Sequence, residues 1–416
     1  MRKSADVVIL MQSSSNYQLL YPSTISWEEY RKYIPLKPFA DEVVEYLNAL
    51  SAAILKDRES RLYPDVITFA FFCRKANIYA QKVKYASADA YRFGRGIIFH
   101  IAPSNVPINF AYSLVAGMLS GNYNVVRVSS KQFPQVDLII KQMNKLKESG
   151  MYVNVAKSIV LVRYERTSDA TSFFSSFAAV RVIWGGDATI AAIRKSEIPA
   201  RSFDVCFADR YSIAAIHPKA ILAASDNEMK RLAERFYNDT YLFDQNACSA
   251  PHLIFWLKSN ISEEELESAR ARFWRVVHDL AASKYELQAI ISVDKLTAFY
   301  RQAIYENVSR ENMPDNYVFR SKMLELPEAP EVFRCAGGYF SEIDIDSLSD
   351  IAQVVTPRYQ TLAYYGFSMD ELRAFVCDNN LVGLDRLVPI GETTAFSFIW
   401  DGYNLIDIFS REVTIQ

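Results

Sequence analysis

The sequence predicts an α/β protein built on parallel sheets. Between residues 91 and 210, strand-like apolar runs alternate with helical segments, and short turns join them. This alternation is typical of βαβ units, in which helices cover both faces of a parallel sheet. Residues 211–385 again alternate long helical runs with apolar strands. The pattern predicts two α/β regions, which suits a chain of 416 residues.

The first ninety residues are predicted to be mainly helical. A short strand is expected at Val7–Met11, and apolar residues at helical spacing begin near Phe39. A second helix is expected from Asp65 to Val83, because the preceding Pro64 suits the first turn of a helix. We expect these helices to cover one face of a sheet.

The strands and helices of the two α/β regions can be given approximate bounds. In the first region, strands are expected at Gly96–Ile101, Asn124–Val128, Ser158–Arg163, Val180–Trp184 and Phe203–Phe207. In the second, strands are expected at Tyr211–Ile216, His252–Leu257 and Gln360–Tyr365, and helices at Glu228–Tyr241, Glu263–Ala282 and Tyr285–Glu306.

We predict three parts in the chain. Residues 1–210 hold the N-terminal helices and a cofactor-binding domain, and residues 211–385 hold a catalytic domain. The tail, residues 386–416, is too apolar and aromatic for a disordered end. It is therefore expected to pack on this protomer or on a partner, as a packing or oligomerisation segment.

Composition and charge exclude several classes of protein. The net charge is −2, so no basic field favours nucleic acid. The five cysteines lie far apart without a CxxC, and the four histidines form no HExxH, so we expect neither a disulfide framework nor a metal site. No apolar run reaches the roughly 18 residues that a membrane span needs. We expect a cytoplasmic protein.

One candidate nucleophile is Cys248, in the small-residue turn DQNACSAP at residues 244–251. A thiol among small residues at the mouth of a strand can be reached by a substrate. The alternative is that Cys248 is a small buried hydrophobic residue, as most free cysteines are.

Three turns at strand ends are candidates for ligand binding, because parallel sheets bind ligands at the carboxyl ends of their strands. The dinucleotide fingerprint GxGxxG is absent, since Gly94-Arg95-Gly96 precedes a strand. Asn105 is either functional or a turn former between two prolines. Gly185-Gly186 suits a phosphate or a simple tight turn. Arg127, followed by two serines, either binds a ribose or 2′-phosphate or is a solvated charge.

Together, four segments resemble the aldehyde dehydrogenase superfamily, and most closely its acyl-CoA reductase branch, typified by the fatty acyl-CoA reductase of bacterial luminescence. They are residues 94–131, 182–195, 243–256 and 383–406, in family order. The resemblance spans about residues 90–410. It implies an aldehyde-dehydrogenase-like fold, with a Rossmann-like parallel-sheet cofactor domain and an α/β catalytic domain.

The resemblance also implies a reaction. Cys248 would attack a fatty acyl-CoA or acyl-protein thioester and expel the thiol, and a hydride from NADPH would then release a fatty aldehyde. Asn105 and the amide of Cys248 would bind the oxyanion. The positions that match cofactor-binding segments are Pro103, Ser104, Arg127, Ser129, Ser130, Gly185 and Gly186. An Arg without a facing acidic residue favours NADPH, with NADH as the alternative. Acyl-protein synthetase and transferase partners, and a homo-oligomer, are also implied.

The chain departs from the aldehyde-oxidising members in one segment. Those members carry an LELGGK-like sequence whose Glu activates the hydrolytic water, and residues 201–211 hold no such motif. Asp204 lies near the place without matching it, and Cys206 beside it is interpreted as a core residue. Two alternatives remain open at this point: NAD(P)-dependent oxidation of a free aldehyde, and a non-catalytic acyl-transfer or scaffold protein.

Overall fold

The computed structural model describes residues 17–85, 91–326 and 328–415, and the strand expected at Val7–Met11 lies outside them. The chain forms two compact units. The first takes the described residues up to Ala208 together with those from Leu405 onward, and the second is Asp209–Asn404. The tail expected as one segment, residues 386–416, is therefore divided between the two units.

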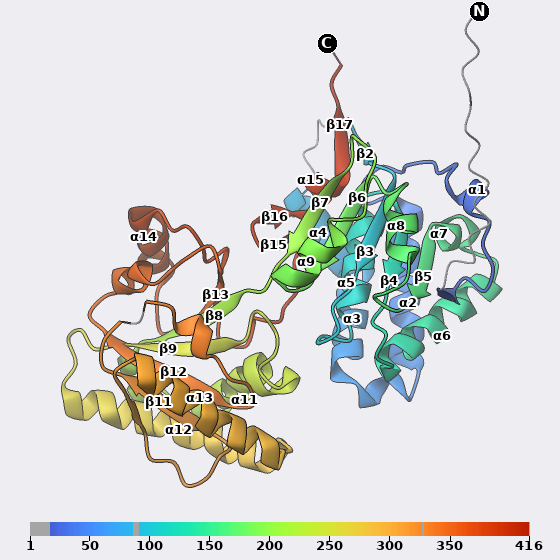
Figure 1. The fold of residues 1–416 in the computed structure, drawn as a ribbon. Helices are drawn as coiled ribbons and strands as arrows, with labels where there is room; N and C mark the ends of the chain where they lie inside the picture. The colour runs from blue at the N-terminus through green and yellow to red at the C-terminus, as the bar shows by residue number, and fades with distance from the viewer. Residues whose placement is uncertain (1–16, 86–90, 327, 416) are drawn as a thin grey trace, which may run out of the picture. The chain divides into compact units, whose positions relative to one another are not determined.

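The first unit is built on a six-stranded sheet in the order β1-β5-β4-β3-β6-β7 (Figure 1). β1 joins the edge antiparallel to β5, and the other pairs are parallel. The strands are β1 (Gln18–Tyr21), β3 (Ile97–Ile101), β4 (Tyr123–Arg127), β5 (Ile159–Arg163), β6 (Val180–Trp184) and β7 (Phe203–Phe207). Each strand predicted between residues 91 and 210 is present, with ends that differ by one residue at most.

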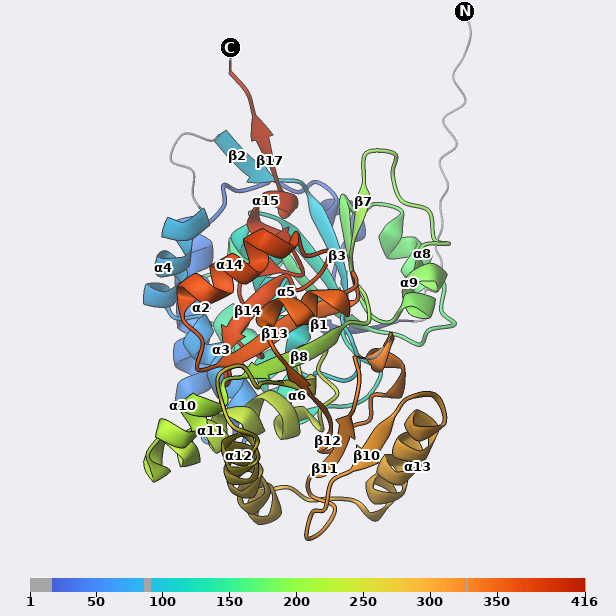
Figure 2. The ribbon, with the colours of Figure 1, turned by 90° about the vertical axis from the view of Figure 1, so that its left-hand side faces the viewer.

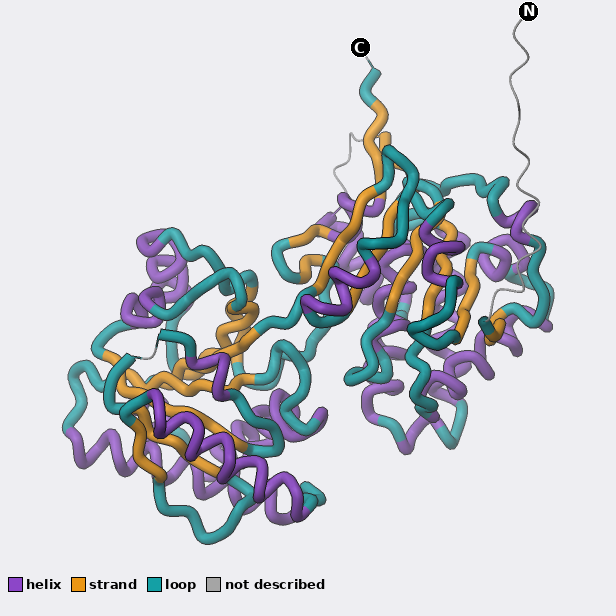
Figure 3. The backbone as a smooth tube through the Cα atoms, in the orientation of Figure 1, coloured by secondary structure: helices purple, strands orange, loops and turns teal. Residues whose placement is uncertain are grey.

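Helices lie on both sides of this sheet (Figure 3). An apolar cluster fills one face, where Phe99 and Val162 of the sheet pack with Phe174 and Ile190. The helices of that face are α8 (Ala170–Ser175) and α9 (Asp187–Ile193). The other face carries α5 (Asn109–Leu119), α6 (Pro134–Glu148) and α2 (Asp41–Lys56), with α2 packed on α5 and α6. The short helix α7 (Val153–Lys157) packs on α2 in this layer, whereas α1 (Trp27–Tyr30) contributes to the apolar cluster on the face of α8 and α9.

The single helix predicted from Asp65 to Val83 is wrong, because the chain breaks it into α3 (Pro64–Phe72) and α4 (Lys75–Tyr85). Two asparagine side chains satisfy the backbone at the break. Asn48 Oδ1 accepts the Lys75 N–H at 3.0 Å, and Asn77 Nδ2 donates to the Phe72 carbonyl at 2.8 Å. Because these groups no longer need helical partners, the chain can turn there without leaving buried polar atoms unpaired.

The end of the chain completes the first unit. α15 (Leu405–Phe409) packs on α5, and β17 (Ser410–Val413) pairs antiparallel with β2 (Tyr91–Gly94). Phe409 is buried, and its carbonyl accepts a hydrogen bond from Asn122 Nδ2 at 2.9 Å. Leu405, Ile406 and Phe409 of the last segment are therefore buried by this chain itself, whereas Ile415 is exposed.

The second unit holds a seven-stranded sheet in the order β10-β11-β12-β9-β8-β13-β14, parallel except at β10. The strands are β8 (Tyr211–Ile216), β9 (Pro251–Leu257), β10 (Val308–Arg310), β11 (Phe319–Met323), β12 (Tyr339–Ile345), β13 (Tyr359–Tyr365) and β14 (Arg386–Pro389). A small ribbon joins β15 (Ile399–Trp400) to β16 (Tyr403–Asn404).

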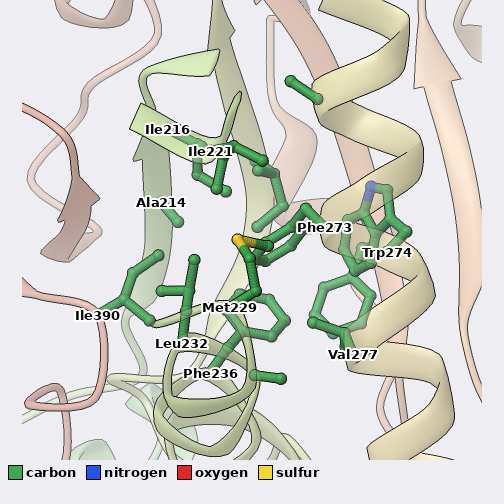
Figure 4. Close-up of a cluster of buried hydrophobic side chains, with 14 of the residues drawn as sticks. Ala214, Ile216, Ile221, Met229, Leu232, Phe236, Phe273, Trp274, Val277 and Ile390 are labelled. Carbon is green, nitrogen blue, oxygen red and sulfur yellow. The ribbon is translucent and has the colours of Figure 1, made fainter. Parts of the chain in front are cut away.

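Helices cover both faces of this second sheet. The helices are α10 (Pro218–Ala223), α11 (Asp226–Thr240), α12 (Glu263–Lys284), α13 (Ala289–Tyr305) and α14 (Met369–Asn379). α13 lies beside the edge strand β10 (Figure 2). Under α11 and α12, Phe236, Phe273 and Trp274 pack with Ala214 of the sheet (Figure 4). The opposite face has its own cluster, which includes Leu362, Leu372 and Phe375. None of the helices in the described residues is long and apolar enough to cross a bilayer.

Candidate active site

Cys248 lies in the turn that connects α11 to β9. A short 3₁₀ turn, Tyr241–Phe243, follows α11, and Asp244 and Gln245 then adopt left-handed φ values of 51° and 60°. The turn brings Cys248 to the start of a buried strand while leaving its side chain partly exposed. This placement fits a substrate-accessible thiol better than a core residue.

The backbone of Cys248 is held by the sheet beneath it. Ser212 Oγ, on β8, donates to the Cys248 carbonyl at 2.7 Å and accepts the N–H of Thr361, on β13, at 3.2 Å. Within the described residues, the N–H of Cys248 donates to no backbone carbonyl. That N–H therefore remains suited to bind an oxyanion. Sequence patterns gave no signal for Ser212.

Burial, together with neighbouring groups of the second unit, sets the pKa of the Cys248 thiol. Burial raises the pKa of Cys248 above its ordinary value, and the Asp209 and Asp401 carboxylates raise it further, whereas the Arg210 backbone amide and the Arg334 guanidinium lower it. Arg334 is fixed by hydrogen bonds to the Arg210 carbonyl at 3.0 Å and to Asp209 Oδ2 at 2.5 Å. The net direction is upward, so the thiol is protonated at neutral pH in the free protein.

His252, four residues after Cys248, does not supply a base. Burial lowers its pKa to about 3, with a smaller contribution from Arg334 in the same direction. The ring stacks on Tyr211, with centroids 5.6 Å apart. His252 is thus a neutral residue of the core at physiological pH.

In the first unit, the predicted ligand-binding turns all lie at the carboxyl ends of the parallel strands, on the same side of the sheet. β4, β3 and β6 are neighbours and run parallel, so the turns that follow them lie side by side at their carboxyl ends. These turns contain all the predicted cofactor positions and Asn105, and they correspond to the region where open α/β sheets bind ligands. The residues are Pro103, Ser104 and Asn105 after β3, Arg127, Ser129 and Ser130 at the end of β4, and Gly185 and Gly186 after β6. Asn105 belongs to the first unit and Cys248 to the second.

Arg127 is a partly buried residue, and not simply a solvated charge. Its Nη2 donates to the Tyr164 carbonyl at 3.2 Å, and its guanidinium lies over the Tyr164 ring, 4.9 Å from the centroid. Burial lowers its pKa, and its Nε is buried without a hydrogen-bond partner in the described part of the chain. A guanidinium with a donor to spare suits a ligand rich in acceptor oxygens.

The two serines after Arg127 differ in exposure. Ser129 is buried, with its Oγ accepting the Lys131 N–H at 3.1 Å and its carbonyl accepting from Arg163 Nε at 3.1 Å. Ser130 is exposed. Ser129 therefore shapes the turn, and Ser130 offers the freer hydroxyl.

The Gly185-Gly186 turn leaves room above its backbone. Gly186 has φ −67° and ψ 162°, which any residue adopts, and a Cβ built there would meet nothing within 4 Å. A Cβ on Gly185 would lie 3.2 Å from Thr189 Cγ2, which is close but is contact with a side chain. Since the fold does not demand glycine at 186, the open space fits the close approach of a ligand such as a pyrophosphate.

Asp204, the acidic residue near the missing catalytic Glu, is engaged elsewhere. Its carboxylate binds Arg181 Nε at 2.8 Å and Nη2 at 3.0 Å, and it lies 3.4 Å from Arg194 Nε. Cys206 is partly buried; it packs against the apolar cluster of the first sheet, and its Sγ accepts a hydrogen bond from Arg194 Nη2 at 3.4 Å. The described residues contain no cluster of His, Cys, Asp and Glu that could hold a metal ion.

Comparisons with solved structures show the fold. Lactaldehyde dehydrogenase from Escherichia coli superimposes with a TM-score of 0.62 at 10% identity, covering 93% of this chain and 88% of that one. An NAD-dependent benzaldehyde dehydrogenase from Corynebacterium glutamicum gives 0.61 at 12% identity, with 92% and 86% covered. A 1-pyrroline-5-carboxylate dehydrogenase from Thermus with bound NAD gives 0.61 at 13%, with 93% and 82% covered. The chain has the aldehyde dehydrogenase fold.

The family follows from the sequence comparison. No curated protein sequence matches the chain. A family model described as acyl-CoA reductase (LuxC) matches residues 76–411, which is most of the 416 residues. The chain belongs to this acyl-CoA reductase family and is an oxidoreductase that acts on acyl or aldehyde groups.

Proposed function

We propose that the protein reduces a fatty acyl thioester to a fatty aldehyde with NADPH, through an acyl-enzyme formed on Cys248. The observation that carries the proposal is the partly exposed Cys248 thiol, held in a firmly hydrogen-bonded turn of an acyl-CoA reductase. The acyl donor is coenzyme A or an acyl-carrying protein. A synthetase and a transferase that handle the acyl group, and assembly into homo-oligomers, belong to the same proposal.

The first half-reaction exchanges one thioester for another. Cys248 Sγ gives up its proton and attacks the thioester carbonyl; the carbon–sulfur bond to coenzyme A breaks, and the coenzyme A thiolate takes up a proton. Because a thioester is broken and a thioester is formed, the exchange is nearly isoenergetic. Arg334 and the amide of Arg210 favour the thiolate at this step.

Both the acyl transfer and the reduction pass through a tetrahedral oxyanion. The Cys248 N–H and the Asn105 side chain are the donors that we assign to it. The loss of one such donor typically lowers the rate about 10²–10³-fold. Asn105→Ala is therefore expected to reduce turnover by that order while leaving Cys248 available to alkylating reagents.

The residues at the carboxyl edge of the first sheet fit a nicotinamide dinucleotide. When bound, the cofactor supplies the hydride that reduces the acyl group. Gly185 and Gly186 would lie against the pyrophosphate, Arg127 and Ser130 would hold the adenosine ribose with its 2′-phosphate, and Ser129 shapes that turn. Pro103 and Ser104 would line the neighbouring part of the same edge. No acidic side chain occurs from Arg127 to Ser130, which favours NADPH over NADH.

The decisive experiment follows cofactor absorbance while the protein is mixed with fatty acyl-CoA of several chain lengths and NADPH, with the aldehyde identified by mass spectrometry. Labelled acyl-CoA without cofactor should tag Cys248, and Cys248→Ala should remain untagged. A folded protein that reduces no acyl thioester, or that oxidises free aldehyde faster than it reduces acyl-CoA, would contradict the proposal. The engaged Asp204 argues against that oxidation.

A further inference from the structure

Three residues before Cys248, Gln245 lies inside the turn, and both of its side-chain N–H donors and its Oε1 are paired with backbone groups. It is only 1% exposed. Its Nε2 donates to the carbonyls of Pro251 at 2.9 Å and Tyr339 at 3.0 Å, and its Oε1 accepts the N–H of Gly338 at 2.9 Å. Its own N–H donates to the Thr240 carbonyl at 2.7 Å.

These bonds connect both ends of the Cys248 turn to the neighbouring strand. Pro251 opens β9, whereas Gly338 and Tyr339 stand at the start of β12, which pairs with β9. Asp244 adds a further link, since its carbonyl accepts the Gly337 N–H at 3.1 Å. One buried side chain thus fixes the chain before Cys248, the chain after it and the adjacent loop.

The adjacent loop is itself fixed. Gly338 has φ +89°, and a Cβ there would lie 2.4 Å from the Tyr317 carbonyl oxygen, so the backbone must stay in a conformation that suits glycine. On the other side of the turn, the Cys248 carbonyl is held by Ser212. Cys248 is therefore held on two sides: by Gln245, three residues before it in the turn, and by Ser212, which binds its carbonyl.

We infer that Gln245 is a positioning residue, which sets the place of Cys248 Sγ and of the Cys248 N–H for acyl transfer. The inference rests on the proposed role of Cys248 as nucleophile. Gln245 touches no reacting atom, because all its side-chain partners are backbone groups of the same unit. It acts through the geometry of the turn, and acyl transfer requires reacting atoms that are placed to within a fraction of an ångström.

Two variants separate positioning from general stability. Gln245→Ala removes all three side-chain bonds, and a misplacement of about 1 Å typically costs on the order of 10²-fold in rate. Gln245→Glu keeps the volume and the acceptor for Gly338, but it presents a carboxylate to two carbonyl oxygens. Protonation of that Glu restores one donor, so its acylation rate relative to the unmodified protein should recover as the pH is lowered. The matched control is Gln353→Glu, an exposed position of the same unit.

The experiment measures, for each full-length protein, acylation of Cys248 by fatty acyl-CoA across pH, alkylation of Cys248 by iodoacetamide with peptide mass spectrometry, and urea unfolding. We expect Gln245→Ala to lower the saturating rate of Cys248 acylation on the order of 10²-fold, with little change in the acyl-CoA concentration that gives half of that rate. The Gln353→Glu control should match the unmodified protein at every pH. If Gln245→Ala does not fold, the isosteric Gln245→Glu carries the test.

Two outcomes overturn the inference: a folded Gln245→Glu protein with unchanged acylation at every pH, or a Gln245→Ala protein that is less stable to urea but acylates Cys248 at an unchanged rate in the absence of urea. The proposed function fails separately, if the unmodified protein takes no acyl group at Cys248. In that case the alkylation rates of Cys248 in the same variants still decide whether Gln245 places the thiol.

Discussion

At the scale of single residues, the surroundings of Cys248 oppose the loss of its proton. Burial and two carboxylates raise its pKa, and only the Arg210 amide and Arg334 act in the opposite direction. A raised pKa means that the thiolate fraction is small at neutral pH and grows as the pH approaches and passes the ordinary value of 9.0. The alkylation rate of Cys248 should therefore rise with pH throughout the neutral and mildly alkaline range.

The contribution of Arg334 can be tested by changing its charge. Arg334→Ala removes a cation that lowers the pKa of Cys248, so that pKa should rise and alkylation at a given pH should slow. Arg334→Lys keeps the charge but loses the forked contact with Asp209 and the Arg210 carbonyl, and should lie between the two. The measurement is the pH profile of iodoacetamide incorporation at Cys248. Identical profiles for Arg334→Ala and the unmodified protein would show that Arg334 does not act on the thiol.

At the scale of elements, β3, β4 and α5 meet around a buried polar cluster that sequence patterns did not reveal. His100 Nε2 donates to Asn124 Oδ1 at 3.1 Å, and its Nδ1 accepts from Ser113 Oγ at 2.8 Å, a pairing that fits the neutral ring. Trp184 Nε1 donates to the same Ser113 oxygen at 3.1 Å. Burial lowers the pKa of His100 to about 4, with the Asn124 bond acting weakly in the opposite direction.

Because the pKa of His100 is lowered in the folded protein, the free energy of unfolding should fall as the pH is lowered. Between the ordinary pKa of 6.5 and about 4, His100 is protonated in the unfolded chain and neutral in the folded one. The stability that it contributes is thus complete above 6.5 and is lost as the pH falls toward 4. One proton taken up on unfolding corresponds to a slope of about 1.4 kcal/mol per pH unit.

The variant His100→Gln removes this titration while keeping a donor and an acceptor. Its free energy of unfolding, from urea titrations between pH 4.5 and 6.5, should change less steeply with pH than that of the unmodified protein, by about 1.4 kcal/mol per pH unit. His278, partly exposed with a raised pKa, provides the control variant His278→Gln, which should not flatten the slope in this way. Parallel slopes for His100→Gln and the unmodified protein would contradict the assignment.

Two glycines of the first unit give a matched pair of predictions. A Cβ on Gly117 would lie 1.9 Å from Asn124 Oδ1 and 2.9 Å from His100 Nε2, so Gly117→Ala should lower the free energy of unfolding by about 1–3 kcal/mol. A Cβ on Gly186 would have no atom within 4 Å, so Gly186→Ala should change the free energy of unfolding by less than about 0.5 kcal/mol.

The Gly186→Ala variant also tests the proposed cofactor site. Because Gly186 is proposed to face the pyrophosphate, this variant should lose much of the rise in melting temperature that NADPH produces. An undiminished NADPH shift in Gly186→Ala would remove that turn from the proposed cofactor site.

The sequence was most informative where local pattern and fold agree. The apolar strands from Ile97 to Phe207 and the long helices α11 and α12 have clear periodicity, and their bounds were predicted closely. β12 was missed because its buried face includes Glu342, which only the fold can satisfy. Its carboxylate accepts from Trp256 Nε1 at 2.9 Å, Trp274 Nε1 at 2.8 Å and Arg320 Nε at 2.6 Å.

In the candidate site too, the sequence identified some residues but not those whose role depends on contacts made only in the fold. The residue types at Cys248, Asn105 and Gly186 could be selected from turns at strand ends and from family resemblance. Gln245 and Ser212 could not, because their importance lies in hydrogen bonds to Tyr339, Gly338 and Thr361, which are distant in the chain. Such contacts have no signature in spacing or composition.

At the scale of the whole molecule, the chain leaves its first unit at Ala208, builds the second, and returns at Leu405. Hydrogen bonds from residues far away in the sequence hold the segment that returns at Leu405. Arg95 Nε donates to the Ile408 carbonyl at 2.7 Å, and Arg92 Nη2 donates to the Asp407 carbonyl at 2.8 Å. The first unit is therefore not a continuous domain, and its stability depends on residues that follow the whole second unit in the sequence.

This dependence can be measured with a single core substitution. Phe409 is 1% exposed, and its carbonyl also binds Asn122, so Phe409→Ala should cost about 3–5 kcal/mol of the free energy of unfolding. Ile415, 72% exposed in the same tail, provides the control, and Ile415→Ala should stay within about 0.5 kcal/mol. The loss should fall on the first unit, so Phe409→Ala should weaken NADPH-induced stabilisation, while iodoacetamide still alkylates Cys248 at its normal rate. If Phe409→Ala changes the Cys248 alkylation rate as strongly as it weakens NADPH-induced stabilisation, the two units unfold together. If it changes neither and leaves the free energy of unfolding unaltered, the tail does not stabilise the first unit.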